Sequence, residues 1–113
     1  MPRSAPTRSV AQAAPVFAAL GDETRLRVVA RLCEEGPLSI SKLTEGVDVT
    51  RQAVTKHLQV LESAGLVKSA RDGRENVYEL QPRRLAKAQQ LLALISEEWD
   101  GTLERLRAFV EDR

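Results

Sequence analysis

The chain is poor in the residues that build metal centres and disulfides. Its 113 residues include one cysteine, Cys33, and one histidine, His57. A lone cysteine cannot form an intrachain disulfide. A metal site built on His57 would need several carboxylate or sulfur partners, and none is spaced to supply them. The sequence also lacks a nucleophile–base pair and a phosphate-binding glycine loop, so it predicts no enzyme and no cofactor.

Long apolar runs are missing as well. No apolar stretch approaches the ~18 residues that a membrane span requires. Residues 1–8 lack both the apolar core of a signal peptide and any acidic residue, so we expect a flexible N-terminal arm there. We therefore expect a soluble, cytoplasmic protein without a membrane partner.

The net charge is close to zero, but the charges are segregated along the chain. Seventeen basic residues against sixteen acidic ones leave a formal charge of +1, which neither favours nor excludes a nucleic-acid partner. Residues 50–61 carry Arg51 and Lys56 and no acid. The acids of the C-terminal region include Glu97, Glu98, Asp100 and Glu104. With 42% hydrophobic residues, a chain of this length fits one compact domain.

The most informative stretch runs from residue 39 to residue 80. Thr50 is a favoured N-cap and Gly65 a favoured helix end, so a helix is predicted over about 50–64. Val54, Leu58 and Leu61 recur at helical spacing and must face a core. Polar side chains remain for the outer face, namely Arg51, Gln52, Thr55, Lys56 and Gln59.

A shorter helix and a hairpin flank this helix. The shorter one, about seven residues long, is predicted from the cap Ser39 to the stop Gly46, with a turn of three or four residues after it. This is helix-turn-helix spacing. Residues 66–70 and 75–80 are β-prone runs around a link that contains Asp72 and Gly73, which predicts a β-hairpin. Arg71 and Arg74 flank its tip, so this hairpin, the wing, can lie along phosphates or reach a minor groove.

Two helices are expected before this stretch. Residues 10–20 form one candidate, which Pro15 either kinks or restarts, because proline is tolerated in a first turn but not in a helix interior. Asp22 caps the second, which ends at Gly36 and Pro37. Its expected apolar stripe is Leu26, Val29, Ala30 and Cys33.

The last predicted helix begins at Pro82 and ends near Val110. Eight of its residues follow alternating steps of three and four and form what we call the seam: Leu85, Ala88, Leu92, Ile95, Trp99, Thr102, Leu106 and Phe109. A helix of about 29 residues spans roughly 43 Å, so part of the seam needs a second subunit to pack on. Gly101 is expected to bend or end the helix. The predicted dimer interface is Leu85, Leu92, Ile95, Trp99, Leu106 and Phe109.

These residues together resemble a known family. Residues 19–27, the helix over 50–61, the segment 64–67 and the segment 73–78 are similar, in order and in register, to the ArsR-type winged-helix transcriptional repressors. The resemblance covers roughly residues 15–80. It implies a winged helix-turn-helix DNA-binding core. With the arm and the long C-terminal helix expected from the patterns above, we predict a mainly α fold with a small β-hairpin, divided into an arm over 1–8, a winged helix-turn-helix core over 9–81 and a C-terminal dimerisation helix over 82–113.

The resemblance also implies partners and site residues. Members of the family are homodimers that bind a roughly palindromic operator in double-stranded DNA, and many release it when a metal or another inducer binds. The 50–61 helix would lie in the major groove, where Arg51 can pair with guanine, Gln52 with adenine, and Lys56 meets phosphate. His57 is either a phosphate contact or a partly buried structural residue. The predicted DNA-binding residues are Ser39, Thr50, Arg51, Gln52, Thr55, Lys56, His57, Arg71 and Arg74.

The sequence departs from the metal-sensing members of that family. Those members carry a Cys-x-Cys pair where this chain has Ser39 and Ser41, and a hydroxyl is a poor soft-metal ligand. The second family metal site uses histidine and carboxylates on the C-terminal helix, and residues 82–113 contain no histidine. We therefore expect no metal response through either site, and an inducer would be an unidentified small molecule.

Three alternatives stay open at this stage. Cys33 is either a redox sensor or a small core residue, and the second is more usual for a lone cysteine on an apolar helix face. Trp99 either lines an inducer pocket or supplies packing at the interface. The whole chain is either a homodimeric, sequence-specific repressor or a protein-interaction module that lost its operator. The module would have lost the basic residues at 51, 56 and 74, and all three are present.

Overall fold

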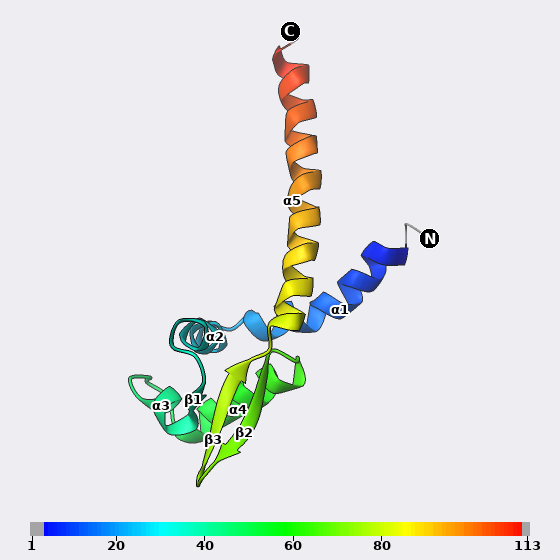
Figure 1. Cartoon of the computed structure of the whole chain (residues 1–113). Helices are drawn as coiled ribbons and strands as arrows, with labels where there is room; N and C mark the ends of the chain where they lie inside the picture. The colour runs from blue at the N-terminus through cyan, green and yellow to red at the C-terminus, as the bar shows by residue number, and fades with distance from the viewer. Residues whose placement is uncertain (1–3, 112–113) are drawn as a thin grey trace.

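The computed structural model describes residues 4–111, with side chains from residue 10 onward. It is a mainly helical winged helix-turn-helix with a small antiparallel sheet, from which a long C-terminal helix projects (Figure 1). The elements follow one another as α1 (Ser4–Leu20), α2 (Glu23–Glu35), β1 (Leu38–Ser39), α3 (Ile40–Thr44), α4 (Arg51–Ser63), β2 (Val67–Asp72), β3 (Glu75–Leu80) and α5 (Pro82–Glu111).

Three helices begin at the caps that the sequence predicts. The side-chain oxygens of Asp22, Ser39 and Thr50 each accept a hydrogen bond from the backbone N–H three residues on, at 3.0 to 3.1 Å. Each bond satisfies one of the N–H groups that a helix start leaves unpaired. The starts of α2, α3 and α4 are therefore confirmed as predicted.

The wing is part of a sheet with strand order β1-β3-β2, and this sheet has one strand more than the predicted hairpin. Leu38 of β1 pairs with Tyr78 of β3. The turn between β2 and β3 also differs from the prediction, because Asp72 is the last residue of β2 and pairs with Glu75. The two-residue turn is thus Gly73 and the residue after it, with φ of 64° at Gly73, which suits glycine in the first central position of a hairpin turn.

Two expectations for the N-terminal half are corrected. Helix α1 begins at Ser4, so residues 4–8 lie in a helix rather than in a flexible arm, and residues 1–3 lie outside the described residues. Pro15 lies inside this one helix and does not restart it. Helix α2 buries Val28, Val29 and Leu32, so of the predicted stripe only Val29 is buried. The other members of that stripe are exposed, namely Leu26, Ala30 and Cys33.

The core lies where α1, α2, α3, α4 and the base of the wing meet the first turns of α5. Its fully buried side chains of largest volume are Val16, Leu43, Val54, Leu58, Leu61 and Leu66. Helix α1 packs along α5, where Lys87 Nζ donates to Gln12 Oε1 at 3.4 Å. This packing sets the direction in which α5 leaves the core, opposite to the tip of the wing (Figure 1).

Helix α5 runs from Pro82 to Glu111 without ending at Gly101. Only its first part joins the core, through Ala88 and Leu91, of which Leu91 is not a seam residue. Leu85 is half-buried, and the other residues of the predicted interface are exposed in the single chain: Leu92, Ile95, Trp99, Leu106 and Phe109. Across residues 4–111, no helix combines the length and the apolar character that crossing a membrane requires.

Candidate nucleic-acid interface

Helix α4 has one aliphatic face in the core and one polar face in solvent. Val54, Leu58 and Leu61 are buried, as their spacing predicts. The side chains predicted for DNA divide by exposure: Arg51, Gln52 and Lys56 are exposed, and Thr55 is half-buried. The hydroxyl of Thr55 donates to the carbonyl oxygen of Arg51 at 2.9 Å, which leaves its methyl group for outside contacts. The exposed polar face of α4 therefore begins at its first turn, with Arg51 and Gln52.

The helix before it is shorter than predicted. Helix α3 has five residues and buries Ile40 and Leu43, and the link to α4 covers residues 45–50 rather than three or four positions. The backbone leaves the helix at Glu45, where ψ is 134°, one residue before the predicted stop at Gly46. Ser39 is half-buried and its hydroxyl oxygen caps α3. The longer link contributes Val47 and Val49, both half-buried, to the edge of the core.

Arginines stand at the tip of the wing, as expected. Arg71 and Arg74 are both exposed, and Arg71 Nε donates to the carbonyl oxygen of Gly73 at 3.4 Å. At the base of the tip, the hydroxyl of Ser41 donates to the carboxylate of Glu75 and so ties α3 to β3. Sequence reasoning missed this contact because its partners are 34 residues apart.

His57 faces the protein as well as solvent. Its side chain is 23% exposed, and its Nδ1 lies 3.8 Å from the Asp22 carboxylate and 3.3 Å from Nη1 of Arg25. Arg25 is itself fixed by a bond from its Nε to the carbonyl oxygen of Ala19 at 2.6 Å. These contacts favour the structural alternative for His57, since they hold α4 against the start of α2.

Two pKa values shift for identifiable reasons. The hydrogen bond from the Arg25 backbone N–H lowers the pKa of Asp22, and the charges of His57 and Arg25 act in the same direction, while partial desolvation opposes them. Burial raises the pKa of Tyr78, and the negative charge of Glu62 raises it further. Asp22 is therefore ionised and Tyr78 neutral at physiological pH.

Metal, redox and inducer sensing were each considered for particular residues of this chain. Among the side chains described, residues 10–111, no group of three or more histidine, cysteine, aspartate or glutamate residues could hold a metal ion. The interpretation of Cys33 as a core residue is wrong, because the thiol side chain is exposed. Trp99 lines an open apolar pocket of about 400 Å³ between α1 and α5, together with Val10, Leu91 and Ile95.

Comparison with known proteins identifies the family. A family model described as a helix-turn-helix domain matches residues 20–70. The chain is 32% identical to the arsenical resistance operon repressor of Escherichia coli K12, over 86% of this chain and 80% of that protein. The solved structure of an ArsR-like transcriptional regulator from Rhodococcus sp. RHA1 is similar with a TM-score of 0.72 and 39% identity, over 88% of this chain and 92% of that one. The chain belongs to the ArsR family of transcriptional regulators.

Membership of the ArsR family makes this protein a DNA-binding transcriptional regulator rather than an enzyme. It confirms the family that the sequence resembles. Another similar structure is a homodimeric winged helix-turn-helix DNA-binding domain from Mycobacterium bovis, with a TM-score of 0.62 and 25% identity, over 79% of this chain and 82% of that one. ArsR-type folds of this kind are therefore known as homodimers.

Proposed function

We propose that this ArsR-family regulator is a homodimeric repressor that reads a palindromic operator with the exposed face of α4. The observation that carries the proposal is the division of α4, whose aliphatic face is buried while Arg51 and Gln52 project from its first turn into solvent. A helix-turn-helix protein reads base edges with the N-terminal residues of its second helix. Arg51 suits guanine and Gln52 suits adenine.

The other predicted residues have supporting roles. Lys56 follows on the same helix, and Arg71 and Arg74 stand on the wing, so these three meet phosphates and set the register of the protein on the duplex. Thr50 and Ser39 cap α4 and α3. In the proposed complex both helix starts face the DNA. His57 acts through its contacts with α2.

The dimer follows from the surplus apolar surface on α5. A single reading helix touches few base pairs, and discrimination among genomic sites requires two half-sites about one DNA turn apart. In this proposal the exposed apolar residues of α5 supply the contact between subunits. The homodimeric Mycobacterium bovis domain supports a dimer, without bearing on which residues form it. The name of the Escherichia coli relative supports repression as the direction of control. We propose that neither metal site of the family operates, because serines occupy positions 39 and 41 and residues 82–113 contain no histidine.

Selection of bound duplexes from a random library with the full-length chain tests the proposal. We expect a pseudo-palindrome whose half-sites lie about one helical turn apart. A mobility-shift titration should then show much weaker binding to an isolated half-site than to the whole. Recovery of sequences without a shared motif would support the interaction-module alternative instead. A reporter gene with the selected site over its promoter distinguishes repression from activation.

A further inference from the structure

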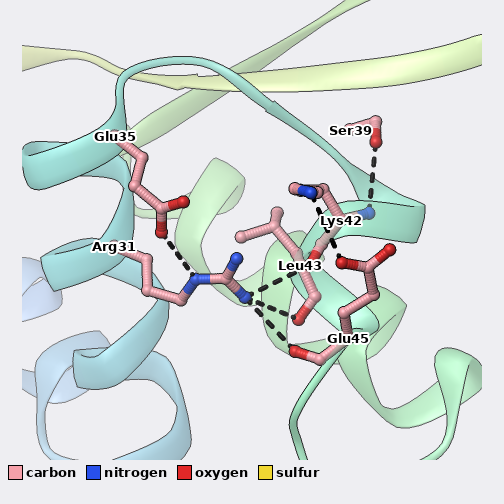
Figure 2. Close-up of polar contacts among 6 residues, drawn as sticks. All are labelled: Arg31, Glu35, Ser39, Lys42, Leu43 and Glu45. Atoms are coloured by element: carbon pink, nitrogen blue, oxygen red, sulfur yellow. Dashed lines mark hydrogen bonds and ion pairs between the residues drawn. The ribbon is translucent and has the colours of Figure 1, made fainter.

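Arg31 of α2 reaches across to the C-terminal end of α3 (Figure 2). Its Nε donates to Glu35 Oε2 at 3.0 Å, one turn further along α2. Its Nη1 donates to the carbonyl oxygen of Lys42 at 3.2 Å and lies 3.5 Å from those of Leu43 and Glu45. The side chain is only 28% exposed. One guanidinium therefore bridges two helices.

Helix α3 needs such a partner. It has five residues, and a helix this short is marginal without tertiary contacts. The last carbonyls of any helix lack intrahelical donors, and a positive charge at this end interacts favourably with the helix dipole. The Lys42 carbonyl also accepts from the Glu45 backbone N–H at 3.2 Å. Arg31 supplies the donor for the carbonyls of Leu43 and Glu45.

Val47 and Val49 of the link after α3 are half-buried against the core, but open space remains between the link and α2. A hollow of about 700 Å³ lies between α2 and residues 46–49 and is lined by Arg27, Arg31 and Val47, among others. A second hollow of about 410 Å³ shares these three lining residues. The guanidinium of Arg31 is the group that spans the space at the point where the chain leaves α3.

We propose that Arg31 is a positioning residue for operator recognition. By holding the carbonyls of Leu43 and Glu45, it fixes where the link over 45–50 delivers the first turn of α4. The inference rests on the proposed function, in which Arg51 and Gln52 read bases. A bidentate contact to a base requires a side chain whose position is held to within about 0.5 Å. A link over 45–50 without the Arg31 contacts would not hold the first turn of α4 so closely. Helix α4 has its own buried residues, Val54, Leu58 and Leu61, so we expect it to stay folded in Arg31 variants.

The experiment compares Arg31→Gln with Arg27→Gln in the full-length chain. Arg27 is on the same helix and lines the same hollows, but its side chain is 73% exposed and pairs with Glu23. Both variants lose one positive charge. We measure anisotropy on the selected duplex and on a random duplex at two salt concentrations. Arg31→Gln should lower the preference for the selected duplex by roughly tenfold, about the value of one base contact, while Arg27→Gln leaves it unchanged.

Two further readouts separate positioning from general stability. Backbone amides over 45–50 should exchange faster in Arg31→Gln, whereas those of α4 from Val54 onward should keep their rates. Arg31→Lys retains the charge and one donor group without the planar fork, so its preference should lie between those of wild type and Arg31→Gln. If Arg31→Gln does not fold, Arg31→Lys provides the same comparison with Arg27→Gln.

The variants distinguish a failure of the positioning role of Arg31 from a failure of the proposed base-reading function. If Arg51→Ala loses preference but Arg31→Gln and Arg31→Lys behave as Arg27→Gln does, the positioning role of Arg31 is refuted and the proposed function stands. If Arg51→Ala keeps full preference, the base-reading function fails, and this inference fails with it. Faster exchange throughout α4 in Arg31→Gln would reduce Arg31 to a general stabilising residue.

Discussion

The hydroxyl of Ser41 donates a hydrogen bond to the carboxylate of Glu75 and so joins α3 directly to the first residue of β3. Both side chains are half-buried. Glu75 pairs with Asp72 at the end of the wing, so this bond is close to the tip that carries Arg71 and Arg74. The orientation of the wing is therefore tied to the helix-turn-helix at its outer end.

We predict that Ser41→Ala weakens DNA binding without changing base preference. The variant loses a hydrogen bond to a charged group, worth about 1 kcal/mol at a half-exposed site, and frees the wing. Because the proposed role of the wing is to meet phosphates, affinity for the selected and the random duplex should fall by the same factor. Anisotropy titrations measure both, with Ser96→Ala on α5 as the control. A loss restricted to the selected duplex would contradict this role of the wing.

Arg51→Ala and Gln52→Ala should act on specificity. Each should cost about 1–3 kcal/mol at one base pair and relax selection there. Lys56→Ala and Arg74→Ala should instead weaken binding to all sequences and flatten its salt dependence. Repeating the library selection with each variant identifies the affected position. Equal losses on specific and random duplexes for Arg51→Ala would show that Arg51 does not read bases.

The lowered pKa of Asp22 predicts how stability depends on pH. A carboxylate whose pKa is lower in the folded state than its ordinary value of 3.8 contributes stability that is present above that value and is lost as the pH falls through the folded pKa. Asp22→Asn keeps a capping oxygen but does not titrate. The difference in unfolding free energy between wild type and Asp22→Asn should therefore be present at neutral pH and shrink below pH ~4. Urea titrations at fixed protein concentration measure it, and a difference that is constant over the acid range would refute the assignment.

Metal ions should leave operator binding unchanged. The hydroxyl of Ser39 caps α3 and that of Ser41 bonds to Glu75, so both oxygens already have partners, and both are weak ligands for soft metals. Zinc, cadmium or arsenite, added in stoichiometric amounts to the protein–DNA complex, should cause no release in a mobility-shift assay. Release by any of the three would reveal a metal site made of other residues.

Trp99→Ala should weaken the dimer and leave the protomer folded. Trp99 is 61% exposed in the single chain, so its removal creates no cavity within the protomer. If it is fully buried between subunits, the change should cost about 3–5 kcal/mol of association free energy. Sedimentation over a dilution series measures this, with Leu26→Ala on α2, 51% exposed and outside the seam, as the control. Unchanged dimerisation in Trp99→Ala would place the interface elsewhere.

Features that depend on short-range chemistry were predicted from the sequence. Caps such as Thr50 satisfy donors three residues away, and the aliphatic spacing of Val54 and Leu58 fixes which face of α4 is buried. Strand β1 was missed because it has two residues and exists only through its pairing with β3. The stripe on α2 was misplaced because its apolar residues allow two helical faces, and the packing of α2 against α1, α4 and β3 selects the one with Val28 and Leu32.

The candidate site also combines features that the sequence predicts with features that only the tertiary fold determines. The exposure of Arg51, Gln52 and Lys56 follows from the pattern of α4 itself. The orientation of His57 toward Asp22 could not be predicted, since it depends on how α2 crosses α4. For Arg31 the sequence offers only its spacing of four from Glu35, and its contacts with α3 carbonyls arise from the tertiary fold.

The pairing of Leu38 with Tyr78 has a consequence for folding. It closes the chain between these two residues into a loop that contains α3, α4 and β2. The entropy cost of closing such a loop grows only slowly with its length, but it is incurred before the paired strands return any stabilisation. Strand β3 is central in the sheet, so it cannot leave β1 without disturbing the loop that holds α4. We therefore expect α4 and the wing to unfold together rather than one after the other.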